Sequence, residues 1–207
     1  MIDPRVELLA LPHPRRIVVI GSWFDLFPAV PPGDVTRYLE DDSSFNYWCI
    51  EPQPWCVEDA RKRADPSRWK FLQMAISDHD ARETFHVSHG SDQCSSLRPY
   101  AVTADYFATF PVEVRRLDTL VESGELPLGA DYVQIDAQGC TLDALRGGPR
   151  FFEHTRMVYL EAEHSEVYKG EALWPAIERA MLELGFKLDP SERSGRPWDD
   201  FLFTRGA

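Results

Sequence analysis

The sequence predicts a doubly wound α/β fold with a mostly parallel sheet and a C-terminal antiparallel hairpin. Strand-like and helix-like segments alternate up to about residue 186, which is the pattern of a parallel sheet with crossover helices. Two further strand-like segments, 186–189 and 200–204, are joined by a loop of Ser, Arg, Gly and Pro, and this favours a closing hairpin over another crossover. A chain of 207 residues can bury one sizeable core, so we expect residues 1–207 to form a single domain.

The first half of the chain supplies three expected parallel strands. Residues 16–21 are a continuous β-branched run closed by Gly, which is typical of a strand buried on both faces. Residues 45–50 are expected to form the second strand and residues 69–76 the third. Between these two, residues 54–64 begin with Pro and carry charged pairs four residues apart, which predicts a helix with a solvated face. The stretch before the second strand contains one helix-compatible segment, 35–40.

The middle of the chain has weaker patterns. Residues 83–88 are expected to add a strand in a hairpin-like excursion, and residues 112–117 alternate apolar and charged side chains, which predicts a half-exposed edge strand. Residues 91–110 mix Ser, Tyr and Phe without clean periodicity, so they form either a lid or substrate loop or an excursion packed on the rim of the sheet. A short helix is expected from residue 118 and ends near Gly124.

Two more buried strands and a long helix complete the predicted fold. The apolar residues 132–135 are followed by Asp136, by a Gly three residues on, and by leucines at helical spacing, which indicates a strand, a tight turn and a short helix. Residues 157–160 are the next buried strand. Residues 173–185 carry a clear apolar stripe and end in Gly, so we expect an amphipathic helix there.

Acidic side chains follow two of these strands at the point where each strand ends. Glu51 follows the strand at 45–50, and Asp136 follows the strand at 132–135. The carboxyl ends of the strands in an open α/β sheet form the rim where ligands bind, so both acids are well placed to meet a ligand. The two oxygens of Glu51 can accept both hydroxyls of a ribose. The alternative is that Asp136 is only a turn or N-cap residue and that Glu51 only caps a strand.

A third polar group, containing Glu161 and His164, follows the strand at 157–160 and is expected on the same rim. Asp136, Glu161 and His164 are therefore the candidate catalytic residues. Histidine takes up protons near neutral pH, which makes His164 the natural base, although it could equally be a loop histidine bonded to a backbone carbonyl. The three side chains could also offer ligands to a divalent metal. We favour acids that bond backbone or substrate, and we predict no metal.

Composition argues against several classes of partner. A formal net charge of −12 repels polyphosphate backbones, so nucleic acid is not expected as a partner. The apolar region 17–30 is interrupted by Asp25 and Pro28 and lacks a small-residue cleavage site, so we expect neither a signal peptide nor a membrane span. Four cysteines lie far apart without a CxxC pair, which fits reduced thiols in a cytoplasm.

The segment VQIDAQGCTLDALRG, residues 133–147, closely resembles the hallmark of FkbM-type methyltransferases. These are S-adenosylmethionine-dependent enzymes with the Rossmann-like class I methyltransferase fold. The resemblance covers about residues 16–205, because four further segments follow in the family's order: Glu51-Pro52-Gln53-Pro54, Ala75-Ile76-Ser77-Asp78, Leu117-Asp118-Thr119-Leu120 and Asp200-Phe201-Leu202-Phe203.

The resemblance implies transfer of a methyl group from S-adenosylmethionine to an oxygen, commonly a hydroxyl of a sugar or of a secondary metabolite. By position, Glu51 would face the ribose hydroxyls, and Asp136 would lie at the junction of cofactor and acceptor. Methyl transfer needs positioning and a base for the hydroxyl proton, and His164 or Asp136 would be that base. The other cofactor contacts implied by position are Gly21 and Ser22 for the methionine part, and Ser77 and Asp78 for the adenine.

The chain departs from the family at the first turn, which usually reads Asp-x-Gly-Ala-Asn-x-Gly. Val19 stands where that Asp would be, Trp23 replaces the Asn and Asp25 replaces the last Gly, so two positions of close approach to the cofactor are bulky or charged. A second hypothesis is therefore a binding or structural module that kept the fold and lost the cofactor. A nicotinamide-dependent oxidoreductase shares the layout but needs a glycine fingerprint that is missing. Acceptor contacts are expected from residues 91–110 and from the loop after His164, while the acceptor's identity and the oligomeric state stay open.

Overall fold

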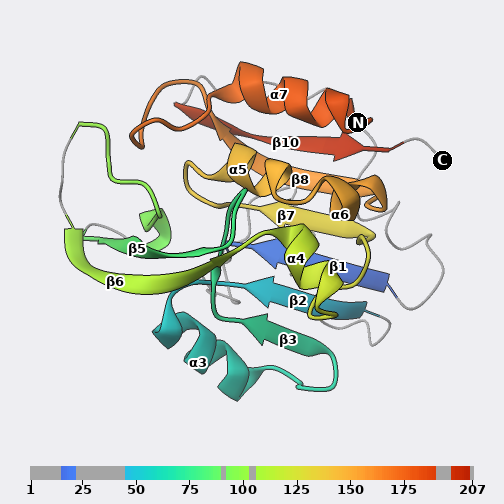
Figure 1. The fold of residues 1–207 in the computed structure, drawn as a ribbon, viewed down its shortest axis with the longest axis horizontal. Coiled ribbons are helices and arrows are strands. Elements are labelled where there is room, and N and C mark those ends of the chain that lie inside the picture. The colour runs from blue at the N-terminus through green and yellow to red at the C-terminus, as the bar shows by residue number, and fades with distance from the viewer. Residues whose placement is uncertain (1–14, 22–44, 90–91, 103–105, 190–196, 206–207) are drawn as a thin grey trace.

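The computed structural model describes residues 15–21, 45–89, 92–102, 106–189 and 197–205. Its main feature is a twisted sheet of seven strands in the order β3-β2-β1-β7-β8-β10-β9 (Figure 1). Neighbours from β3 to β8 pair in parallel, whereas β10 is antiparallel to both β8 and β9. The doubly wound sheet and the closing hairpin of the sequence prediction are confirmed. The strands are β1 Arg15–Ile20, β2 Phe45–Ile50, β3 Trp69–Leu72, β7 Tyr132–Ile135, β8 Met157–Glu163, β9 Lys187–Leu188 and β10 Trp198–Thr204.

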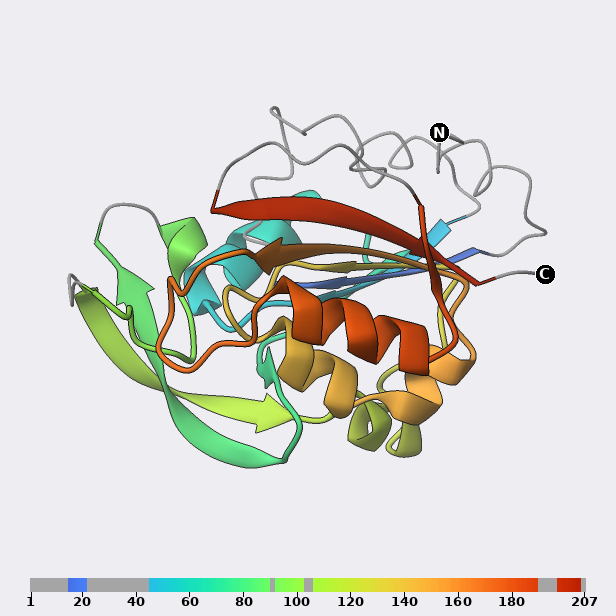
Figure 2. The same ribbon diagram turned by 90° about the horizontal axis from the view of Figure 1, so that it is seen from above.

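Each face of this sheet carries its own hydrophobic core, because successive side chains of a strand point to opposite faces. In β1, Val18 and Ile20 join the larger core, while Ile17 and Val19 join the smaller one. This division explains why β1 is a continuous apolar run. The larger core is covered by four helices that gather on one side of the sheet in Figure 2, and the smaller core packs against α3. The helices are α3 Pro54–Arg63, α4 Leu117–Glu122, α5 Thr141–Arg146, α6 Pro149–Glu153 and α7 Trp174–Glu183.

A second sheet of three strands, in the order β4-β6-β5, extends beside the main sheet (Figure 1). It consists of β4 Ala75–Ile76, β5 Ala81–Ser88 and β6 Tyr106–Arg115, and Phe85, Val87, Val112 and Val114 form its core. The short helix η1 Asp92–Cys94 lies between β5 and β6 in sequence.

The second sheet corrects two expectations about strands. The predicted single strand at 69–76 is divided by a turn in which the Met74 N–H donates to the Leu72 carbonyl at 3.2 Å, so its second part pairs with β6 instead of continuing in the main sheet. The predicted edge strand at 112–117 is the end of a ten-residue strand that lies between β4 and β5, because both of its edges are paired. The predicted helix at 35–40 lies outside the described residues. Within the described ranges, no helix is long and apolar enough to cross a membrane.

Candidate active site

The site lies where the order of strands reverses. From β1 the chain continues to β2 on one side, and from β7 it continues to β8 on the other, so the carboxyl ends of β1 and β7 form the switch point at which open α/β sheets bind ligands. The turns after these two strands touch, since the Asp136 N–H donates to the Ile20 carbonyl at 2.9 Å. Gly21 has φ +71°, and a Cβ there would lie 1.8 Å from the Asp136 carbonyl oxygen. Only glycine allows this approach.

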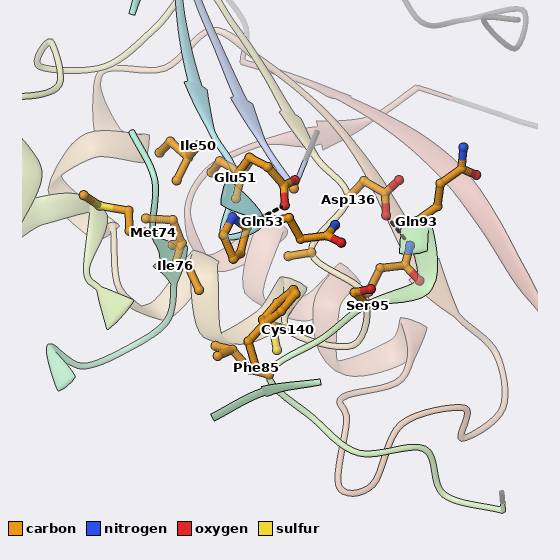
Figure 3. A pocket seen from close by; sticks show the side chains of 17 residues that line it. Ile50, Glu51, Gln53, Met74, Ile76, Phe85, Gln93, Ser95, Asp136 and Cys140 are labelled. Carbon is orange, nitrogen blue, oxygen red and sulfur yellow. Dashed lines mark hydrogen bonds between the residues drawn. The ribbon is translucent and has the colours of Figure 1, made fainter. Parts of the chain in front are cut away.

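A cavity opens at this point, between the carboxyl ends of the strands and the second sheet (Figure 3). Glu51 and Asp136 both line it, although they lie 85 positions apart in the sequence. Figure 3 shows each carboxylate among the side chains around the cavity. The other lining residues are Ile20, Gly21, Ile50, Pro52, Gln53, Met74, Ala75, Ile76, Phe85, Gln93, Ser95, Leu97, Ala137, Gln138 and Cys140.

Glu51 is held firmly in the wall of the cavity. Its side chain is only 2% exposed, and its Oε1 accepts a hydrogen bond of 2.9 Å from the Gln53 N–H at the start of α3. The N–H of Glu51 itself donates to the Leu72 carbonyl of β3 at 3.1 Å, which fixes the end of β2. A carboxylate in this position can accept hydrogen bonds from hydroxyl groups of a ligand in the cavity.

The part of the cavity beyond Glu51 is apolar. Met74 and Ile76 come from the region of β4, Phe85 comes from β5 and Leu97 follows η1, so the second sheet builds this wall. Apolar walls of this kind suit the flat ring of a nucleobase. Three residues of the segment 91–110 also line this cavity: Gln93, Ser95 and Leu97. The expected role of this segment is contact with the acceptor, and these three residues line the same cavity as Glu51.

The predicted adenine contacts Ser77 and Asp78 are not among the lining residues. Ser77 is buried, its N–H donates to the Arg115 carbonyl at 3.1 Å, and it packs so closely on Gly147 that a Cβ there would meet the Ser77 carbonyl oxygen at 2.0 Å. Asp78 is paired with His79 Nδ1 at 2.7 Å, and this hydrogen bond lowers the pKa of Asp78. Ser22, the other predicted contact at the first turn, lies outside the described residues.

Gln138 connects Asp136 to Glu161. It is the only non-glycine residue with positive φ in the described part of the chain, at +42°, and this conformation turns its side chain back toward the end of β7. Its Nε2 donates to Asp136 Oδ1 and also to Glu161 Oε1, the latter at 3.1 Å. The sequence hallmark contains Gln138, but no local pattern assigns this side chain a role.

The carboxyl groups of β8 lie beyond Asp136 and have unusual protonation. Burial, and next the charge of Asp136, raises the pKa of Glu161 to about 9. Burial, and next the charge of Glu171, raises the pKa of Glu163 to about 8. Both groups therefore hold a proton at neutral pH. Glu163 is 3% exposed, and its Oε2 has no hydrogen-bond partner among the described residues.

His164 is not brought to this side of the sheet. Side chains alternate along β8, so Glu161 and Glu163 point to one face, while Ala162 lies in the larger core on the other. His164 follows the Ala162 face: its ring lies edge-on to Phe201 of that core, and its Nε2 is 2.8 Å from Asp199 Oδ2. The expected trio is thus divided, with Asp136 and Glu161 joined through Gln138 and His164 apart from them. Within the described residues, no group of three His, Cys, Asp or Glu side chains could hold a metal ion.

Comparison with known proteins identifies the family. The Methyltransferase FkbM domain matches residues 30–188. The chain belongs to this family. The 2-O-methyltransferase NoeI of Sinorhizobium fredii (strain NBRC 101917 / NGR234), a curated relative of this FkbM chain, is 30% identical over 151 residues, which are 67% of this chain and 62% of NoeI. The FkbM chain thus spans about three fifths of the length of that relative.

Solved structures share the fold of this FkbM chain at low sequence identity. A putative S-adenosylmethionine-dependent methyltransferase from Listeria monocytogenes has a TM-score of 0.53 and 10% identity, covering 99% of both chains. Methyltransferase FkbM from Methylobacillus flagellatus KT has a TM-score of 0.51 and 12% identity, covering 92% of this chain and 43% of that one. Magnesium protoporphyrin IX methyltransferase from Synechocystis PCC 6803 has a TM-score of 0.51 and 10% identity, covering 98% and 74%. These likenesses establish a Rossmann-like methyltransferase fold.

Proposed function

We propose that this chain is an S-adenosylmethionine-dependent O-methyltransferase that acts on a hydroxyl of a small molecule. The observation that carries the proposal is that Glu51 and Asp136, at the carboxyl ends of β2 and β7, line one cavity in a chain of the FkbM family. The relative NoeI is named a 2-O-methyltransferase, which supports oxygen as the methylated atom. The net charge of −12 supports a small acceptor over nucleic acid, and the four free thiols support a reducing compartment such as the cytoplasm.

The residues that line the cavity suit the cofactor in their chemistry. We assign the ribose hydroxyls to Glu51, because this carboxylate is buried and offers acceptor oxygens. We assign the adenine to the apolar wall at Met74, Ile76 and Phe85, next to the expected position at Ser77. The methionine part then lies near Gly21, where the absence of a Cβ lets the turns after β1 and β7 meet.

Asp136 is the proposed base. Bound in this cavity, S-adenosylmethionine supplies a methyl group on a sulfonium, and transfer to a hydroxyl oxygen releases S-adenosylhomocysteine and one proton. Asp136 lies at the end of the cavity away from the adenine wall, so an acceptor approaches past it, and its carboxylate takes the hydroxyl proton. Glu161 is joined to Asp136 through Gln138 and is the second acid on the acceptor side. His164 points to the other face, so we assign it no proton transfer.

The competing proposal is a module that kept the fold and lost the cofactor. Trp23 and Asp25 of the altered first turn favour it, and both lie outside the described residues. Isothermal titration of the chain with S-adenosylmethionine and with S-adenosylhomocysteine separates the two proposals. A methyltransferase binds both in the micromolar range, and absence of heat with both ligands at millimolar concentration would leave only the module.

Transfer itself is measured with tritiated S-adenosylmethionine and a panel of hydroxylated acceptors such as methyl glycosides. We expect label in an ether product that resists mild base, as a methyl ether does and a methyl ester does not. Asp136→Asn is the matched negative control, because it keeps the shape of the side chain and removes the base.

A further inference from the structure

Tyr168 is a buried residue of the loop after β8 that touches the acidic end of the site without lining the cavity. Its side chain is 2% exposed, and its hydroxyl donates to Gln138 Oε1 at 2.6 Å. The same hydroxyl lies 3.1 Å from the Cys94 carbonyl oxygen, but a phenol has one proton to donate, and the shorter contact to Gln138 is the stronger one. Burial raises the pKa of Tyr168, so this hydroxyl stays protonated and remains a donor.

The hydrogen bond from Tyr168 decides which way the Gln138 amide faces. A primary amide has one acceptor oxygen and two N–H donors. With Oε1 occupied by the Tyr168 hydroxyl, both amide hydrogens point to carboxyl groups, one to Asp136 and one to Glu161. The flipped amide would set two acceptor oxygens, its own and that of the Asp136 carboxylate, against each other, and it would leave the Tyr168 hydroxyl facing an NH2 group that cannot accept its proton.

The surroundings hold both partners in place. The backbone carbonyl of Gln138 accepts a hydrogen bond of 2.6 Å from Ser96 Oγ. This bond fixes the backbone of Gln138 at φ +42°. Gly139 lies under the Tyr168 ring, and a Cβ there would come within 2.8 Å of the ring. The ring of Tyr100 stacks on the ring of Tyr168, with ring centroids 5.2 Å apart. The hydroxyl and the amide therefore meet in one fixed geometry.

We propose that Tyr168 is a positioning residue of the methyl transfer: through Gln138 it orients the two carboxyl groups, Asp136 and Glu161, that face the acceptor. The catalytic meaning of this proposal rests on the proposed function. The hydrogen-bond relay itself, from Tyr168 to Gln138 to the two acids, rests on the contacts alone.

The relay has a measurable electrostatic consequence. Three neighbouring acids, Asp136 from β7, Glu163 from β8 and Asp200 from β10, raise the pKa of Glu161. The hydrogen bond from Gln138 opposes them and lowers that pKa. Removing this hydrogen bond raises the pKa of Glu161 further.

Tyr168→Phe tests the proposal, because it removes the hydroxyl and keeps the ring that packs on Gly139. Tyr47→Phe is the matched control: it also removes a buried tyrosine hydroxyl, but Tyr47 lies in the smaller core, where its ring stacks on that of Trp69. The readout is a titration of the side-chain carboxyl signals by 13C NMR. We expect the midpoint of Glu161 to rise by about half to one pH unit in Tyr168→Phe and to stay in place in Tyr47→Phe.

Gln138→Asn is the second variant, because Asn tolerates positive φ but is too short to bridge Tyr168 and both acids. It should raise the midpoint as Tyr168→Phe does, and the double variant should add nothing further, since both remove one relay. With an acceptor in hand, Tyr168→Phe should lower kcat about tenfold and leave the acceptor KM unchanged, because the carboxyl groups are misoriented while the acceptor still binds.

Two results would overturn the proposal: a carboxyl midpoint in Tyr168→Phe that equals that of the wild type, or an additive effect in the double variant. If Tyr168→Phe does not fold, the midpoint of Gln138→Asn decides in its place. Titration with S-adenosylhomocysteine distinguishes a failure of the proposed function from a failure of the hydrogen-bond relay. A wild-type chain that does not bind this ligand would refute the proposed function, and the NMR midpoints would still decide on the relay.

Discussion

Replacing Glu51 by Gln tests the assignment of the ribose directly. The substitution preserves the size of a side chain that is 2% exposed, and the amide oxygen can still accept the Gln53 N–H that Oε1 accepts now at 2.9 Å. The group turned to the cavity changes from a charged acceptor to an NH2 donor. The fold should therefore survive, while the ribose hydroxyls lose a charged acceptor.

The size of the effect follows from the kind of hydrogen bond that is lost. A hydrogen bond to a charged group contributes about 1.5–3 kcal/mol, and each 1.4 kcal/mol is a factor of about ten in Kd. We therefore expect Glu51→Gln to weaken binding of S-adenosylhomocysteine by about 10- to 150-fold in isothermal titration, with an unchanged melting temperature.

Glu58→Gln is the matched control, because Glu58 lies on the exposed side of α3 and pairs with Lys62 at 2.9 Å. Its Kd should equal that of the wild type. A folded Glu51→Gln chain that binds S-adenosylhomocysteine within threefold of the wild type would refute the placement of the ribose at this carboxylate.

Three further predictions concern the turns and the acids of the site. Gly21→Ala should lower both the melting temperature and the affinity for S-adenosylhomocysteine, since its Cβ would lie 1.8 Å from the Asp136 carbonyl oxygen. Gly124→Ala is the control, because Gly124 also has positive φ but a Cβ there would meet nothing within 4 Å. It should show only the backbone strain of about 1–2 kcal/mol and unchanged binding. Asp136→Asn should lower kcat by about 10²- to 10⁴-fold with the Kd for S-adenosylhomocysteine nearly unchanged, and a variant of normal activity would exclude Asp136 as the base. Glu161 has a folded pKa of about 9, above its ordinary value of 4.5, so the folded state holds a proton that the unfolded state releases, and the free energy of unfolding falls as pH rises from about 4.5 to about 9. Glu161→Gln should reduce that slope by up to about 1.4 kcal/mol per pH unit in urea unfolding at pH 5, 7 and 9, and an identical slope in the variant would contradict the burial of this carboxyl.

The sequence by itself determined the architecture and the two acids that define the cavity. Strand signals are local: the β-branched run that became β1 is apolar on both faces because both faces are buried. Once the strands are parallel and doubly wound, their carboxyl ends must meet on one rim. Glu51 and Asp136 could therefore be placed together although neither is near the other in the chain.

Only the tertiary structure decided what surrounds those acids. The turn at Met74 moves residues 75–76 into the second sheet, and that sheet brings Phe85 and Leu97 into the cavity wall. No local pattern specifies such a pairing. The apolar and polar side chains of β6 alternate because one face of this strand packs in the core of the second sheet, beside its partner β5, and not in the main core.

The acidic end of the site depends on packing in the same way. His164 and Glu161 are three residues apart, and the alternation of a strand puts them on opposite faces, which the expectation of a shared rim overlooked. The high pKa of Glu161 comes from burial and from Asp136, and the orientation of Gln138 comes from Tyr168, 30 residues away. A sequence records which side chains follow each strand, whereas their charge and orientation arise from neighbours that only the folded chain brings into contact.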